Sequence, residues 1–164
     1  MLRNAVILIC GLILAPVAAW AQSDVPKLPD SLTEPERRLV LKEQGTKGHV
    51  EAALKLAELK LVEANKIVEV GGYDLALKNL NLYAALVSYS DAYARRLPAS
   101  EAKERNKSLK VLEQAIFKQQ RPVEALRRDL PFNFREETDV LIETLKRIRL
   151  RAIDDVLGGG NMIK

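Results

Sequence analysis

A pair of adjacent glycines, Gly71-Gly72, divides residues 47–97 into two long arms with the same hydrophobic pattern. In each arm, apolar or small residues recur at alternating steps of three and four, which keeps them on one face of an α-helix. Glycine tolerates the left-handed backbone that often ends a helix, so Gly71 is expected to end the first arm. The pattern therefore predicts a helical hairpin. The two stripes are Val50, Leu54, Ala57, Leu61, Ala64 and Val68, and then Ala76, Leu80, Tyr83, Val87, Ser90, Ala94 and Leu97.

The two arms are expected to be unequal. Residues 79–90 of the second arm carry no formal charge, and the arm has a second apolar stripe, so it should be packed on two sides. The first arm carries charged residues over the rest of its surface, which predicts one buried face and one solvated face. The second stripe consists of Leu75, Leu82, Leu86, Tyr89 and Tyr93.

Three further helices flank the hairpin. Thr33 and Glu36 match a capping box, which predicts a short helix over about 34–44 that ends at Gly45. Ser100 is a good cap for a helix that should end at Leu130-Pro131. Its stripe keeps phase across a proline at position 122, which predicts a kink more than an end. The stripe consists of Leu109, Leu112, Ile116, Val123, Leu126 and Leu130.

Asn133 and Glu136 form a second capping-box pattern, which predicts a last helix over about 134–157 with Gly158 as its stop. Only 5% of residues are aromatic, so the core should be aliphatic, as suits helix-on-helix packing. We therefore predict an all-α domain over 33–158, a four-helix, mostly antiparallel up-down-up-down bundle with a short extra N-terminal helix. The last stripe is Thr138, Leu141, Leu145, Ile148 and Ala152, extended by Val156.

The first 21 residues have the pattern of a secretory signal peptide. Arg3 is followed by an uncharged run over 5–21, which ends in the small-x-small sequence Ala19-Trp20-Ala21. Cleavage after Ala21 is expected, and an uncleaved anchor is the alternative. Residues 22–32 should then be a flexible tether and residues 159–164 a disordered tail.

Cys10 is the only cysteine and lies in the middle of the apolar run, after Ile9, which argues against lipid attachment. The mature chain would then have no disulfide and no thiolate metal site. The formal charge of +4 is mild, and an exported protein is a poor candidate for binding nucleic acid.

Three groups of polar residues are candidate sites, and each has a simpler interpretation. His49 is the only histidine and lacks a Glu-x-x-His partner, so we expect it to be exposed and not to bind metal. Ser88, Ser90 and Asp91 would form a polar pocket with the nearby tyrosines. The simpler interpretation is that the serines bond back to the helix and Asp91 pairs with Arg95.

A row of alternating charge, spaced by four residues, runs along the last helix. We expect Glu143 to neutralise Arg147 and Arg151 to neutralise Asp155, so that the row is a solvated face and not an anion-binding patch. Of the cationic residues in this part of the helix, only Lys146 and Arg149 would then have no partner in the row. The row consists of Asp139, Glu143, Arg147, Arg151 and Asp155.

Two resemblances accompany these patterns. The segment from Ala64 through Gly71-Gly72-Tyr73 to Leu80 resembles the middle of a tetratricopeptide unit, although it occurs once and its arms exceed those of a repeat of about 34 residues. Over Leu54–Leu61, the glycine turn and Leu126–Pro131, the chain is similar to a group of bacterial helical proteins of unknown function that bear signal peptides. This resemblance implies an exported helical protein and no particular activity.

The sequence therefore predicts an exported, non-catalytic interaction or scaffold module, periplasmic or extracellular, whose partner is a protein or another envelope component. No residue is assigned to catalysis, cofactor binding or metal binding, and no stable membrane anchor is expected after cleavage. The apolar surface of 73–97 would also allow a homodimer. The alternatives are a small-ligand-binding bundle with a pocket around Tyr83, Ser90 and Tyr93, and a periplasmic chaperone-like protein.

Overall fold

The computed structural model describes residues 25–158, which fold into helices joined by short connections. No strand occurs in this range, so the prediction of an all-helical domain is confirmed for it. The predicted signal peptide (1–21) and tail (159–164) lie outside the described residues, as do residues 22–24 of the predicted tether. The elements are α1 (Glu34–Leu41), α2 (Thr46–Glu69), α3 (Tyr73–Arg95), the short 3-10 helix η1 (Ala99–Glu101), α4 (Ala102–Asp129) and α5 (Phe132–Gly158).

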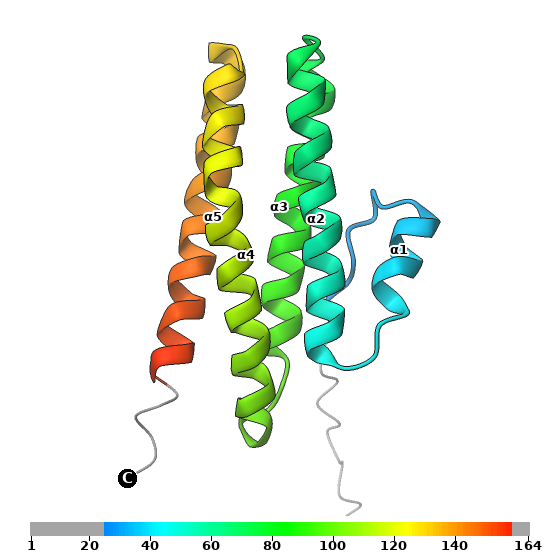
Figure 1. The fold of residues 1–164 in the computed structure, drawn as a ribbon, viewed down its shortest axis with the longest axis vertical. Coiled ribbons are helices and arrows are strands. Elements are labelled where there is room, and N and C mark those ends of the chain that lie inside the picture. Colours follow the sequence, from blue (N-terminus) through cyan, green and yellow to red (C-terminus); the bar gives the residue numbers. More distant parts are fainter. Residues whose placement is uncertain (1–24, 159–164) are drawn as a thin grey trace, which may run out of the picture.

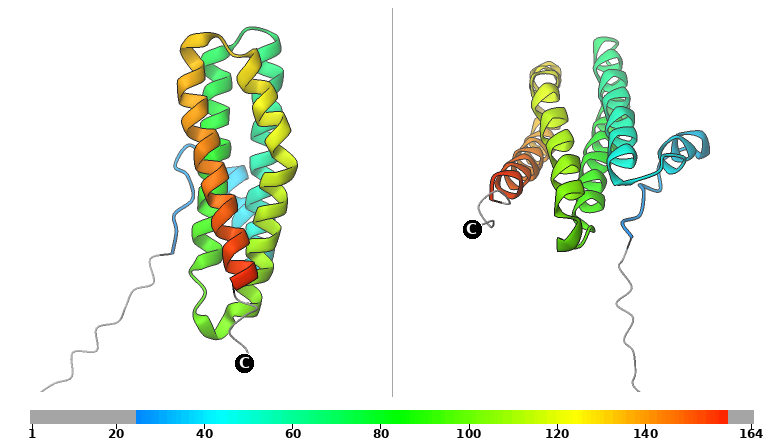
Figure 2. Two further views of the ribbon diagram at one scale, coloured as in Figure 1. Left: turned by 90° about the vertical axis from the view of Figure 1, so that its left-hand side faces the viewer. Right: turned by 60° about the horizontal axis from the view of Figure 1, so that its bottom comes forward.

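The four long helices lie side by side as two antiparallel hairpins, α2 with α3 and α4 with α5 (Figure 1). The second hairpin packs against the first mainly through contacts of α4 with α2, while α3 contacts both α4 and α5. Sequence neighbours are usually neighbours in space, but α4 lies closer to α2 than to α3, the helix that precedes it. Residues 96–101 carry the chain from one hairpin to the next at one end of the molecule (Figure 2).

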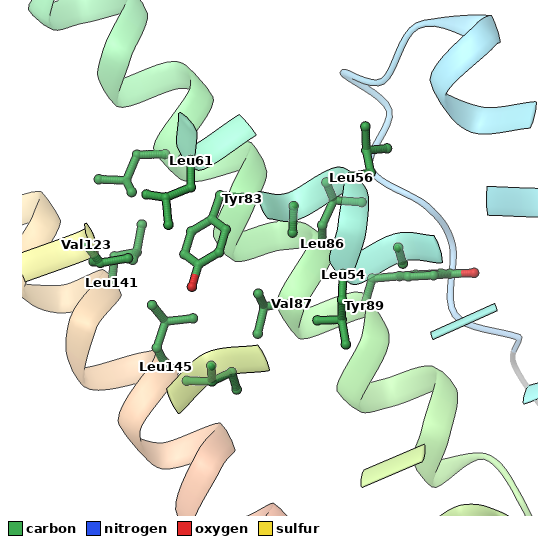
Figure 3. Packing of buried hydrophobic residues seen from close by; sticks show 14 of the residues in the cluster. Leu54, Leu56, Leu61, Tyr83, Leu86, Val87, Tyr89, Val123, Leu141 and Leu145 are labelled. Carbon is green, nitrogen blue, oxygen red and sulfur yellow. The ribbon is translucent and has the colours of Figure 1, made fainter. Parts of the chain in front are cut away.

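The aliphatic core lies between the hairpins and contains the predicted stripes. All six residues of the first-arm stripe are buried in α2, and six of the seven residues of the second-arm stripe are buried in α3, the exception being the half-buried Leu97. Tyr83 sits at the centre of this core with its ring among aliphatic side chains of α2, α4 and α5 (Figure 3). The predicted stripes of α4 and α5 are likewise buried, with Val156 half-buried.

The prediction that the first arm has only one buried face is wrong. Leu56 and Ala53, which lie outside its stripe, are also buried, because α1 packs across this side of α2 (Figure 1). Lys60 Nζ of α2 binds Glu36 Oε1 of α1 at 2.6 Å. Part of the predicted tether (22–32) is also packed against the folded domain, since Leu28 and Leu32 are buried in the core cluster.

The helix ends follow some of the predicted signals and depart from others. Helix α1 ends at Leu41, so Gly45 precedes α2 and does not end the first helix. Ser100 lies inside η1, and the residue before α4 is Glu101. Both the backbone N–H and the hydroxyl of Thr33 donate to Glu36 Oε2 at 2.9 Å, so the first capping box is present. The second is wrong, because α5 begins at Phe132 and Asn133 lies inside its first turn. The backbone carbonyl of the preceding Pro131 accepts from the N–H of Phe134 at 3.0 Å. Helix α4 runs through Pro122 without ending.

The turn between α2 and α3 depends on both glycines. Gly71 has φ +78°, where a Cβ is strained, and its N–H donates to the Val68 carbonyl at 2.9 Å. The N–H of Gly72 donates to the Ile67 carbonyl at 3.0 Å, which completes the Schellman pattern of hydrogen bonds. A Cβ on Gly72 would lie 2.7 Å from Ile67 Cγ2. The turn therefore has one geometry, and that geometry fixes which residues of the two arms face each other.

We predict that Gly71→Ala destabilises the protein by about 1 kcal/mol, because alanine is strained in the left-handed region. The matched control is Gly48→Ala inside α2, where a new Cβ would meet nothing closer than 3.7 Å. That change should stabilise the protein by about 0.5–1 kcal/mol through helix propensity. Urea unfolding followed by circular dichroism measures both, and a neutral Gly71→Ala would contradict the role given to the turn.

Candidate functional site

The densest group of aromatic and titratable side chains lies where the start of α2 meets the end of α3. We call His49, Tyr89, Tyr93 and Arg96 the His49 cluster. The imidazole of His49 stacks on the ring of Tyr93, with centroids 4.0 Å apart and an angle of 10°. Arg96 Cζ lies 3.8 Å from the centroid of the same tyrosine ring. His49 Nε2 is 2.5 Å from the hydroxyl oxygen of Tyr89.

The His49 cluster favours a neutral imidazole. Burial lowers the pKa of His49, and the charge of Arg96 lowers it further, against the opposing effects of a hydrogen bond to the Glu43 backbone and of the Glu43 carboxylate. The direction of the hydrogen bond between His49 Nε2 and the Tyr89 hydroxyl depends on the tautomer of the imidazole, since the hydroxyl can either donate or accept. Burial also raises the pKa of Tyr89 to about 12.

The prediction that His49 is exposed is wrong, since only 4% of its surface is accessible. The hairpin register explains why. His49 lies 22 residues before Gly71 and Tyr93 lies 21 residues after Gly72, so an antiparallel hairpin folded at the glycines brings them together. Counting outward from the turn would have found this pair. Stripe periodicity alone could not, because it does not say which residues face each other across two helices.

A network of charged side chains joins α3 to α5 beside the core. Asp91 is 4% exposed, and its two carboxylate oxygens accept from Arg95 Nε at 2.8 Å and from Arg151 Nη2 at 2.6 Å. Arg95 also donates to Asp155 of α5. The predicted pairing of Asp91 with Arg95 is therefore present, and Arg151 completes the neutralisation of a carboxylate that is nearly inaccessible to water.

The prediction that the charge row on α5 neutralises itself along its own helix is wrong. Arg151 and Asp155 each pair with a residue of α3, and Asp139 pairs with Arg127 of α4. Glu143 binds Lys146 at 2.8 Å, and Arg149 Nε donates to Glu113 of α4 at 2.9 Å. The row is thus mainly a set of contacts between helices, because α3 and α4 present opposite charges across from it.

The three groups of the predicted ligand pocket do not converge. The Ser90 hydroxyl donates to the Leu86 carbonyl at 2.8 Å, so it is satisfied within its own helix. Tyr93 belongs to the His49 cluster, whereas the Tyr83 ring points into the aliphatic core (Figure 3). The Tyr83 hydroxyl has no hydrogen-bond partner, and burial raises the pKa of Tyr83 above its usual value. Tyr83 is therefore a packing residue with an unsatisfied polar atom.

An apolar groove of about 290 Å³ lies between α4 and α5, on the pair of helices that faces the viewer in Figure 2 (left). We call it the α4–α5 groove. Its edge is Leu150, which is 61% exposed. Phe117 is 62% exposed and lies under the guanidinium of Arg149, a residue that lines the groove. The apolar lining is Ile116, Val123, Ile142, Leu145 and Leu150. The polar lining is Gln120, Glu124, Lys146 and Arg149.

A second hollow continues this groove between α4 and α5, and a third lies next to the second along α5. Together the three are lined by five cationic side chains and three carboxylates. The cations are Arg127, Arg128, Lys146, Arg147 and Arg149. The groove therefore combines an apolar floor with a rim of mixed charge that is positive in balance.

Comparisons with known protein families, with curated proteins and with solved structures find no match for this chain. Within residues 25–158, no three His, Cys, Asp or Glu side chains gather in a way that could hold a metal ion. In the same range, no helix has both the length and the apolar character needed to span a bilayer.

We predict opposite effects for removing two buried tyrosine hydroxyls. Tyr83→Phe should stabilise the protein by about 1 kcal/mol, because it removes a buried polar atom that has no partner. Tyr89→Phe should destabilise it by about 1 kcal/mol, because the buried His49 Nε2 loses its hydrogen-bond partner. Urea unfolding of both variants measures the difference, and stability changes of the same sign would contradict the assignment of the two hydroxyls.

Proposed function

We propose that this chain is an exported, non-catalytic interaction module in which α2 to α5 form an antiparallel four-helix bundle. The alternating direction of the helices and the contacts of α2 with α3 and α4, and of α5 with α3 and α4, support the bundle. The apolar, small-x-small pattern of residues 5–21 supports export. The polar groups that sequence analysis singled out are used in packing, capping and ion pairs.

The observation that carries the proposal is the α4–α5 groove. The packing of the helices covers the aliphatic core, whereas Leu150 is 61% exposed on the lining of the groove and Phe117 is 62% exposed under Arg149 of the rim. A groove between two parallel ridges of side chains is the surface into which an amphipathic helix of another protein fits. The rim adds selectivity, because charged residues at the edge of an interface orient a partner more than they strengthen it.

The partner that fits this groove is a protein segment that forms a helix with an apolar stripe and acidic flanks. The apolar stripe would cover Leu150 and the floor, and acidic side chains would meet the positive balance of the rim. The rim cations already pair with carboxylates at 2.8 and 2.9 Å, as Lys146 with Glu143 and Arg149 with Glu113. An acidic partner would therefore compete with these surface pairs, which individually contribute little to stability.

We predict that Leu150→Glu abolishes partner binding without unfolding the protein. The apolar anionic dye anilinonaphthalene sulfonate should bind the wild-type groove, and the variant should bind it about tenfold more weakly, because burial of a leucine contributes about 1.5–3 kcal/mol. The matched control is Leu157→Glu, a similarly exposed leucine of α5 outside the groove, which should leave binding unchanged.

The same three proteins are then used to capture partners from an envelope extract. A partner of the proposed kind is retained by wild type and Leu157→Glu and lost with Leu150→Glu. Equal retention by all three would contradict the groove as the binding surface. If the protein instead has a chaperone-like role, wild type and Leu157→Glu should suppress the aggregation of unrelated unfolded proteins. Leu150→Glu should not suppress it.

We predict that the protein recovered from the envelope or the medium of a bacterial host begins at Gln22. A small residue is needed three positions before the cut, so Ala19→Arg should retain residues 1–21. Trp20→Leu changes the permissive middle position and serves as the control. Intact-mass spectrometry measures each product, and a wild-type protein that keeps its first 21 residues would point to an anchor.

A further inference from the structure

The buried stripe of α4 contains a polar residue at a position where its spacing predicts an apolar one. Gln119 lies three residues after Ile116 and four before Val123, so it continues the alternation of three and four along the stripe. Gln119 is 4% exposed, and its side-chain oxygen Oε1 has no hydrogen-bond partner among residues 25–158. Native structures rarely keep a buried polar atom without a partner, because it destabilises the fold. Packing alone therefore does not explain Gln119.

A second acceptor is left without its helical donor by Pro122. The carbonyl of residue 118 in an α-helix normally accepts from the N–H of residue 122, and proline has no N–H. Helix α4 nevertheless continues through this proline from Ala102 to Asp129. The carbonyl of Lys118 therefore lacks the donor that an uninterrupted helix would supply. The two acceptors, one from a side chain and one from the backbone, belong to adjacent residues.

Both acceptors belong to residues that line one hollow of about 300 Å³ between α2 and α4, the helices through which the two hairpins mainly pack (Figure 1). The accessible wall of this hollow is almost entirely apolar. On the α2 side, Leu61 is 2% exposed and Val62 is 45% exposed, so the hollow reaches from the core to the surface. Apolar walls with a few well-placed polar groups are typical of a site for a small molecule.

The charges of the lining favour a neutral ligand over a cationic one. Glu58 Oε1 of α2 pairs with Lys118 Nζ of α4 at 3.0 Å. The lining also contains Lys66, so its ammonium groups outnumber its carboxylates. A cationic donor would be repelled by this balance, whereas a neutral N–H or O–H group can donate to the two uncharged acceptors.

We propose that the hollow between α2 and α4 binds a small neutral hydrogen-bond donor carried on a short apolar chain, such as a primary amide or an alcohol. The apolar chain would lie against Leu61, Val62 and Pro122, and the donor would bind Gln119 Oε1 and the Lys118 carbonyl. The ligand would then satisfy the acceptors that α4 leaves without a partner. This site is separate from the α4–α5 groove and does not depend on the partner proposed for it.

The first test adds three probes with the same apolar chain to the intact protein and follows its backbone amides by NMR. Pentanamide should bind with a Kd of about 1 mM, as expected for a ligand of about seven non-hydrogen atoms, and should shift amides of residues 58–66 and 118–123. N,N-dimethylpentanamide has no N–H and should bind about tenfold more weakly. Pentylammonium is a cationic donor and should also bind more weakly than pentanamide.

The second test compares two adjacent glutamines of α4. Gln119→Met removes the unpaired acceptor at similar volume, so it should weaken pentanamide binding about tenfold while the urea midpoint stays at or above that of wild type. Gln120→Met is the matched control, because Gln120 donates to Glu124 at 3.0 Å and does not line the hollow. Its pentanamide affinity should equal that of wild type.

A third variant, Pro122→Ala, tests the backbone acceptor. Alanine restores the N–H that can bond to the Lys118 carbonyl, so the variant should raise the urea midpoint and weaken pentanamide binding. Equal binding of pentanamide by wild type and either Gln119→Met or Pro122→Ala would overturn the proposal. Tighter binding of either of the other two probes than of pentanamide would do the same. A urea midpoint of Gln119→Met below that of wild type would show that the amide is satisfied in the fold, which also overturns it.

Discussion

The hydrogen-bonded turn at Gly71-Gly72 is the constraint on which the rest of the structure depends. Two amide donors and a left-handed glycine fix its shape, so residues on the facing stripes of α2 and α3 meet at about equal distances from the turn. This register places Leu61 opposite Tyr83 in the core and His49 against Tyr93 at the far end of the hairpin. A different turn would keep both stripes apolar but would change every pair across them.

The second hairpin is positioned by a different kind of contact. Aliphatic packing has little directional preference, so a smooth interface of leucines and valines would tolerate sliding of one helix pair along the other. Ion pairs between helices remove that freedom: Asp91 with Arg151 links α3 to α5, and Glu58 with Lys118 at 3.0 Å links α2 to α4. Pairs at the surface add little stability, but their fixed geometry selects one arrangement of the two hairpins.

The helices themselves were predictable because hydrophobic period and caps are local signals. Thr33 with Glu36, the glycine turn and one main stripe on each of the four long helices appear in the structure as the residues indicate. The second stripe of α3 appears in part, because Leu86 and Tyr89 are buried but Leu75 is 55% exposed. The predictions that failed concern contacts between segments that are distant in the sequence. The burial of His49, the second covered face of α2 under α1 and the pairing of the α5 charge row with α3 and α4 are set by which helices meet. Charge spacing on one helix carries no information about a neighbour, so it predicted pairs within α5.

The first helix and the groove lie on opposite sides of the molecule. Residues 25–45 cover α2 on one flank, and the α4–α5 groove opens on the other (Figures 1 and 2). Leu28, Leu32 and Val40 of this segment nevertheless belong to the same core cluster as the residues of α4 and α5. Any energetic connection between them must pass through α2 and α4, whose packing joins the hairpins. Because interiors are close-packed and transmit strain, a change that moved residues 25–45 would reach the groove through this packing.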